Sequence, residues 1–154
     1  IFGKLDDPNK RPIFSMARLD RIKNLTGLAE CFGKSQELQD RCNLILVAGK
    51  LRVEESGDNE ERDEIIKLYR IIEQYNLQGK IRWLGVRLPK GESGEIYRVI
   101  ADRQGIFVQP ALFEAFGLTI LEAMISGLPT FATQFGGPLE IIQDKFNGFY
   151  INPT

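Results

Sequence analysis

Short apolar runs alternate with segments of helical periodicity along almost the whole chain, and this alternation restricts the fold more than any other feature. The expected strands are 13–17, 44–48, 80–85, 106–109, 130–133 and 148–151. The expected helices between them are 24–38, 60–76, 94–102, 118–126 and 138–144. Such alternation with short connections is typical of a parallel sheet with helices on both faces. We therefore expect a single α/β domain with a six-stranded parallel sheet, in the order 3-2-1-4-5-6 that right-handed crossovers favour.

The length of 154 residues corresponds to one domain. Residues 1–11 are polar and proline-containing, which predicts a linker, and residues 12–154 form the expected domain. The chain begins at Ile1 without an initiator Met, so we expect it to be a piece of a longer protein. No apolar run reaches 18 residues, so no transmembrane helix is expected.

Charge and residue usage exclude several classes of function. The 20 basic and 21 acidic residues give a net charge of −1, which argues against a nucleic-acid or acidic-membrane partner. The sequence contains no histidine, so every histidine-based triad and metal site is excluded within this chain. Cys31 and Cys42 lack the spacing of a redox or metal motif, and we expect two buried thiols in a reducing cytoplasm.

The loops that follow the strands are the candidate sites, because ligands bind at the carboxyl ends of parallel strands. Arg18 and Lys23 lie between the first expected strand and a helix, with Asn24 as the expected N-cap. Two cations beside a helix N-terminus favour a phosphate site. The alternative is a pair of surface bases near a helix cap.

A second candidate follows the fourth expected strand. Glu114 lies in the loop, and Glu122 lies about one turn inside the next helix, where a carboxylate can accept hydrogen bonds from a vicinal diol such as a ribose. Gly117 permits close backbone approach, and the amides of Leu118 and Thr119 open the helix. The alternative is that both acids only interact with the helix dipole.

Gly136 and Gly137 follow the fifth expected strand, where they present backbone amides to a ligand or form an ordinary turn. The loops after the first, fourth and fifth strands should then converge at one edge of the sheet. The acidic stretch 51–64 indicates a solvated loop and helix start. No GxGxxG or Walker pattern is present, and no DxD triplet offers a divalent-metal site, so no metal is expected.

Taken together, several segments resemble the sucrose synthases. Glu114 and Glu122 form an E-x7-E pattern, which marks many retaining glycosyltransferases built from two Rossmann domains. The segment 11–27, together with the run 58–61, is much more specific for the family. The segments that carry the resemblance are 16–28 (MARLDRIKNLTGL), 58–61 (DNEE), 107–119 (FVQPALFEAFGLT), 127–133 (GLPTFAT) and 136–138 (GGP).

The resemblance implies that the chain is most of a C-terminal, Rossmann-like, nucleotide-binding domain that lacks its final helix. Members of the family reversibly convert sucrose and a nucleoside diphosphate into fructose and a nucleotide-glucose, with retention and without a metal or separate cofactor. The resemblance implies that Arg18 and Lys23 hold the diphosphate and that Glu122 holds the ribose. The residues implied to meet the transferred glucose and the phosphates are Glu114, Phe116, Gly117, Leu118 and Thr119.

Arg87 and Ser93 stand where plant-type members carry a Gln and an Asn that recognise uracil. Arginine is only a donor and serine is short, whereas an amide offers both a donor and an acceptor. We therefore expect relaxed base choice, with ADP and ADP-glucose used at least as well as UDP and UDP-glucose. The alternative is that Arg87 points into solvent and the backbone recognises the base.

The resemblance also implies that the acceptor site and a catalytic histidine belong to an N-terminal domain absent from this chain. The chain alone is then expected not to cleave sucrose, and the full-length enzyme is expected to be a cytoplasmic homo-oligomer. Three alternatives remain open. They are a sucrose-phosphate synthase, another retaining glycosyltransferase, and a non-catalytic nucleotide-binding module.

Overall fold

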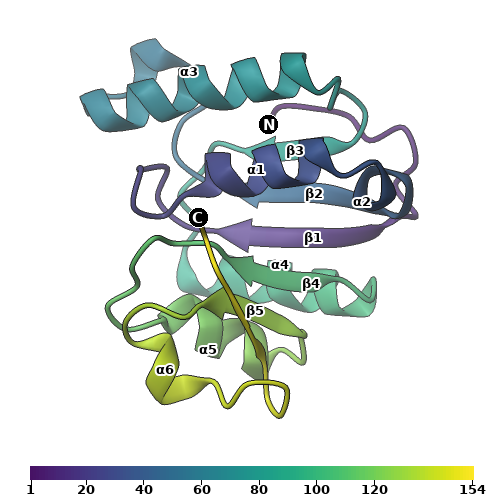
Figure 1. Ribbon diagram of the computed structural model, residues 1–154. Coiled ribbons are helices and arrows are strands. Elements are labelled where there is room, and N and C mark those ends of the chain that lie inside the picture. Colours follow the sequence, from purple (N-terminus) through teal and green to yellow (C-terminus); the bar gives the residue numbers. More distant parts are fainter.

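Six parallel strands form one sheet in the computed structural model, which describes all 154 residues apart from the side chain of Lys90 (Figure 1). The order in the sheet is β3-β2-β1-β4-β5-β6, so the predicted α/β class, strand number and order are confirmed. The strands are β1 (Arg11–Met16), β2 (Cys42–Val47), β3 (Ile81–Leu84), β4 (Ile106–Gln109), β5 (Thr130–Thr133) and β6 (Phe149–Ile151).

Helices cover both faces of the sheet. Ile13 of β1 packs in one core with residues of α1 and α3, whereas the adjacent Phe14 packs in a second core with residues of α4 and α5. This division follows from the alternation of side chains along a strand. No helix in the described part of the chain is long and apolar enough to cross a membrane. The helices are α1 (Leu25–Lys34), α2 (Gln36–Arg41), α3 (Asn59–Gln74), α4 (Lys90–Asp102), α5 (Leu118–Ile125) and α6 (Pro138–Ile141), with a 3-10 turn η1 (Val53–Glu55).

The helix expected at 24–38 is divided into α1 and α2 by Ser35. The Ser35 backbone is extended, and its hydroxyl accepts a hydrogen bond from the Leu38 N–H at 3.3 Å, which caps α2. Serine favours such a capping position because its hydroxyl can replace a backbone acceptor. Helix α4 also begins earlier than the expected residue 94, at Lys90.

Asn24 occupies the expected N-cap position of α1, but its side chain does not cap the helix. Its backbone is left-handed, with φ of 55°, and its side chain makes no cap hydrogen bond. Instead, Asn24 Nδ2 donates to the carbonyls of Pro110 at 3.0 Å and Pro153 at 3.2 Å. The side chain therefore joins the β1–α1 loop to the end of β4 and to the segment after β6.

The residues before β1 lie along the edge of the sheet. Phe2 forms an antiparallel bridge with Trp83 of β3, through backbone hydrogen bonds of 2.7 and 2.9 Å. The expectation that both thiols are buried is wrong, because Cys31 is exposed and Cys42 is only half-buried. In α1, Ala29 and Phe32 face the core, and Cys31 lies on the other side of the helix.

Candidate functional site

A cleft of about 690 Å³ lies at the carboxyl ends of β1, β2 and β3. Its lining includes residues from the β1–α1 loop, from the loop after β3 and from the first turns of α4 and α5. The loops after β1, β4 and β5 meet as expected, because Lys23 pairs with Glu114 and a backbone bridge joins Glu114 to Gly136. The predicted site residues that line the cleft are Arg18, Arg87, Ser93, Thr119 and Glu122.

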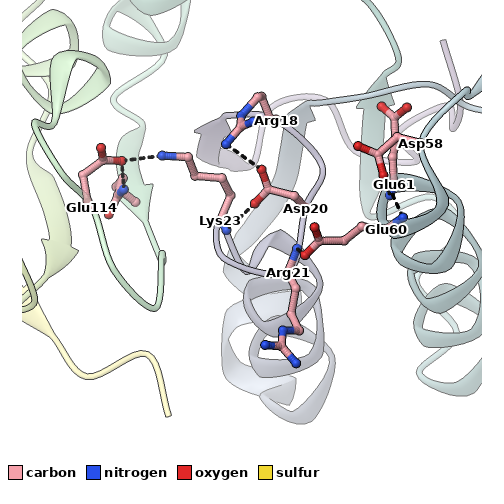
Figure 2. Close-up of polar contacts among 9 residues, drawn as sticks. Arg18, Asp20, Arg21, Lys23, Asp58, Glu60, Glu61 and Glu114 are labelled. Atoms are coloured by element: carbon pink, nitrogen blue, oxygen red, sulfur yellow. Dashed lines mark hydrogen bonds and ion pairs between the residues drawn. The ribbon is translucent and has the colours of Figure 1, made fainter.

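Asp20 organises the loop that follows β1. Its carboxylate pairs with Arg18, with Nη2 and Oδ2 3.0 Å apart, and accepts the Lys23 backbone N–H at 2.8 Å (Figure 2). The Arg21 backbone N–H donates to Glu60 at the start of α3, at 3.1 Å. The loop is therefore held from two sides, while the Arg18 side chain remains 74% exposed.

Glu114 receives hydrogen bonds from three different segments. Lys23 Nζ lies 2.8 Å from Oε2 (Figure 2). Gln109 Nε2 donates to the same oxygen at 2.6 Å. The Phe116 N–H donates to Oε1 at 3.3 Å. The Glu114 carboxylate thus links the β1–α1 loop, the end of β4 and the loop that leads into α5.

This environment keeps Glu114 ionised. Burial alone raises its pKa, but Lys23 and the backbone N–H groups of Phe116 and Gly117 outweigh burial and hold the pKa below its ordinary value of 4.5. Hydrogen bonds to a charged carboxylate stabilise that charged form. Glu114 is therefore a fixed negative charge at neutral pH, and a proton donor is not available at this position. Gln109 Oε1, by contrast, is buried without a hydrogen-bond partner among the described residues.

Gly136 lets the loop after β5 pass directly beside Glu114. Its φ is +98°, and a Cβ added there would lie 2.2 Å from the Glu114 carbonyl oxygen. A backbone bridge joins Gly136 to Glu114, and the Gly137 N–H donates to the Glu114 carbonyl at 2.7 Å. Only a residue without a side chain allows this approach.

Glu122 reaches the cleft from α5, and a buried tyrosine contacts it from α4. The Tyr97 hydroxyl donates to Glu122 Oε2 at 3.2 Å. Thr119, three residues earlier on α5, lines the same cleft. Gly117, the N-cap of α5, has the left-handed conformation, with φ of 92°, which glycine adopts without strain.

The remaining predicted site residues lie beside the cleft and do not line it. Lys23 and Glu114 form their ion pair in the neighbouring loops. Phe116 and Leu118 are exposed, at 78% and 69%. The structure therefore separates the predicted residues into those that line the cleft and those around the Glu114 carboxylate.

Five polar residues of this region had no expected role in the site. Asp20, Lys50, Asp58 and Glu61 line the cleft, and Tyr97 contacts Glu122. Lys50 directly follows the clearest apolar strand and Gly49, so the rule on carboxyl ends could have identified it. Asp58 caps α3 by accepting N–H groups of its first turn, which explains why this end of the acidic stretch is ordered. Among the described side chains, no cluster of His, Cys, Asp or Glu forms a candidate metal site.

Comparison with known proteins supports the resemblance drawn from the motifs. The chain is 80% identical over 154 residues to a sucrose synthase of Thermosynechococcus vestitus, which confirms the resemblance to that group. The alignment covers all of this chain and 19% of the relative, so the chain spans about a fifth of the length of the curated relatives it matches.

Solved structures share the fold at lower identity. Anabaena HepE in complex with UDP and glucose superimposes with a TM-score of 0.75 at 24% identity, covering 94% of this chain and 35% of HepE. A sucrose-phosphate synthase from Thermosynechococcus elongatus superimposes with a TM-score of 0.73 at 24% identity, covering 96% of this chain and 34% of that protein. The family model for glycosyl transferases group 1 matches residues 1–154, and the chain therefore belongs to that family.

Proposed function

We propose that this chain is the nucleotide-binding part of a sucrose synthase. The reaction is the reversible transfer of a glucosyl group between sucrose and a nucleoside diphosphate, with retention and without a metal or separate cofactor. The observation that carries the proposal is a single cleft lined by both Arg18 and Glu122, which come from the loop after β1 and from α5. The 80% identity to a relative with that name supports the choice of reaction.

Arg18 and Lys23 hold the diphosphate in this proposal. Each cation already has a carboxylate partner, Asp20 for Arg18 and Glu114 for Lys23. A guanidinium carries five N–H donors and an ammonium three, so each ion pair leaves donors for phosphate oxygens. The carboxylates therefore orient the cations toward the phosphates and leave N–H donors free to bind the phosphate oxygens.

Charge stabilisation is the chemical contribution of this half of the site. Negative charge grows on the leaving phosphate when the glucosyl bond of the nucleotide-glucose breaks, and fixed cations and backbone N–H groups lower that barrier. Glu114 does not act as an acid here, because its low pKa keeps it ionised. Its part is to hold Lys23 and the loop of Phe116 and Gly117 in position beside the phosphates and the transferred glucose.

The remaining contacts concern the ribose and the base. Glu122 accepts the ribose hydroxyls, and Arg87 and Ser93, which line the cleft, lie beside the base. Acceptor recognition and the dry, closed site belong to a second domain of the longer protein, which we propose is a cytoplasmic homo-oligomer. The chain alone then supplies leaving-group contacts without the acceptor contacts.

Measurements on the purified chain and on the full-length enzyme test this proposal. Calorimetry on the purified chain should detect weak binding of ADP and UDP, and a coupled assay on the same chain should detect no sucrose cleavage. A full-length enzyme carrying this chain should cleave sucrose in the presence of either nucleotide. Robust turnover by the chain alone would overturn the two-domain interpretation. Absence of nucleotide binding in the full-length enzyme would overturn the assignment of the cleft.

A further inference from the structure

Tyr97 is a buried polar residue next to the cleft that the proposed reaction does not use directly. It is 1% exposed, and its ring packs edge-on against Phe14 at 5.5 Å and Phe107 at 5.7 Å between ring centroids. Its hydroxyl donates to Glu122 Oε2 at 3.2 Å. An aromatic core therefore fixes the ring, and the ring directs one hydrogen-bond donor at a carboxylate on the neighbouring helix.

The placement on α4 follows from helical spacing. Ser93 and Tyr97 are four residues apart, so they lie on the same side of α4, and Ser93 lines the cleft. Tyr97 lies one turn deeper, where α4 meets α5. Burial, together with the negative charge of Glu122, raises the pKa of Tyr97 far above its ordinary value of 10.0, so the hydroxyl remains a donor at every physiological pH.

We propose that Tyr97 is a positioning residue for ribose recognition, which holds the Glu122 carboxylate in the orientation that accepts the ribose hydroxyls. This inference rests on the proposed function, in which Glu122 binds the ribose. Tyr97 touches neither nucleotide nor sugar. It acts only through Glu122 Oε2, while Oε1 remains open to the ligand.

The physical reason is the freedom of an exposed glutamate. Three side-chain torsions allow the Glu122 carboxylate to occupy several rotamers, and selecting one on ligand binding costs conformational entropy. A rigid buried donor selects the rotamer before the ligand arrives, which is preorganisation. Removing the donor should therefore weaken only the part of nucleotide affinity that comes from the ribose hydroxyls.

The test compares Tyr97→Phe with the wild-type chain. Both are titrated by calorimetry with ADP and UDP, and the tighter nucleotide is then compared with its 2′,3′-dideoxy analogue. Losing one hydrogen bond to the carboxylate should weaken binding of the normal nucleotide by about two- to tenfold. Binding of the dideoxy analogue should stay unchanged, so the affinity ratio between the two nucleotides should fall.

Two further variants separate positioning from a general structural effect. Tyr150→Phe removes the same atom from a hydroxyl that donates to the Ile142 carbonyl outside the cleft, and its affinity ratio should remain that of the wild type. In a Glu122→Gln background, Tyr97→Phe should cause little further loss. Thermal melts of all variants confirm that they are folded.

The outcomes distinguish a failure of the proposed function from a failure of the role given to Tyr97. A wild-type chain that binds the normal and dideoxy nucleotides equally contradicts the ribose role of Glu122, and with it this inference. If the wild type binds the normal nucleotide more tightly than the dideoxy analogue and Tyr97→Phe shows the same affinity ratio, the role of Tyr97 is overturned. The proposed function then remains intact. The inference is supported if the ratio of affinities for the normal and dideoxy nucleotides falls in Tyr97→Phe and not in Tyr150→Phe.

Discussion

The ion pair between Lys23 and Glu114 should contribute measurably to stability, which Lys23→Met tests. The two side chains are 21% and 12% exposed, so the pair is neither fully buried nor on the open surface. Removing one partner of a buried pair costs about 3–5 kcal/mol and an exposed pair contributes about 0–1 kcal/mol, so we expect a loss of about 2 kcal/mol. For a domain of this size that loss lowers the Tm by about 4–8 °C.

The matched control is Lys34→Met. Lys34 pairs with Glu30 at 2.7 Å, a distance close to that of the Lys23 pair, but its side chain is 62% exposed. Such an exposed pair within one helix contributes little to stability, because solvent and salt screen the attraction between its charges. Calorimetric or circular-dichroism melts at neutral pH should therefore show a clear loss for Lys23→Met and almost none for Lys34→Met.

Acid should remove the difference in Tm between the wild type and Lys23→Met. The folded pKa of Glu114 lies below its ordinary value of 4.5, so its contribution is complete above that pH and is lost as the pH falls through the folded pKa. The difference in Tm should be full at pH 7 and should narrow below about pH 4.5. A difference that is absent at pH 7, or that grows on acidification, would refute the assigned geometry of the pair.

Three further predictions concern function in a full-length enzyme carrying this chain. Arg18→Ala should lower turnover more than it lowers sucrose affinity, because it should raise the activation free energy by about 1.5–3 kcal/mol. Unchanged steady-state kinetics would show that Arg18 is only a surface charge. Glu122→Gln should weaken nucleotide binding in calorimetry, because the amide converts one acceptor oxygen into a donor; unaltered affinity would remove Glu122 from the site. ADP should give at least the catalytic efficiency of UDP, and Arg87→Gln should shift the ratio toward UDP; a strong UDP preference in the wild type would refute the role given to Arg87.

Local sequence signals account for most of the fold. The bounds expected for the fourth and fifth strands, 106–109 and 130–133, coincide with β4 and β5. Both are short apolar runs with a glycine or proline beside them, so composition alone marks their ends. The break at Ser35 is not visible in the sequence because no proline lies between Phe32 and Leu38, and a single hydroxyl contact decides the boundary.

The site was less predictable because its contacts join distant segments. The sequence predicts that the loops after β1 and β4 converge, but no spacing rule predicts that Lys23 of one loop pairs with Glu114 of the other. Gln109 was assigned to a strand, and nothing local showed that its amide meets Glu114 at 2.6 Å. Tyr97 resembled any aromatic core residue until the packing of α4 against α5 placed its hydroxyl beside Glu122.

The balance of charge around the cleft has a consequence for the speed of nucleotide capture. Among the described residues that line it, the cations Arg18, Lys50 and Arg87 face the four carboxylates of Asp20, Asp58, Glu61 and Glu122. With three cations against four carboxylates, the lining offers an approaching diphosphate no net positive charge, and salt screens the remaining field beyond about 8 Å. Association without electrostatic steering depends little on ionic strength. The fit between ligand and cleft then affects binding only after the two are in contact. Under the proposed function, nucleotide binding in this cleft would then be selected by short-range fit and residence time, and not by the rate of encounter.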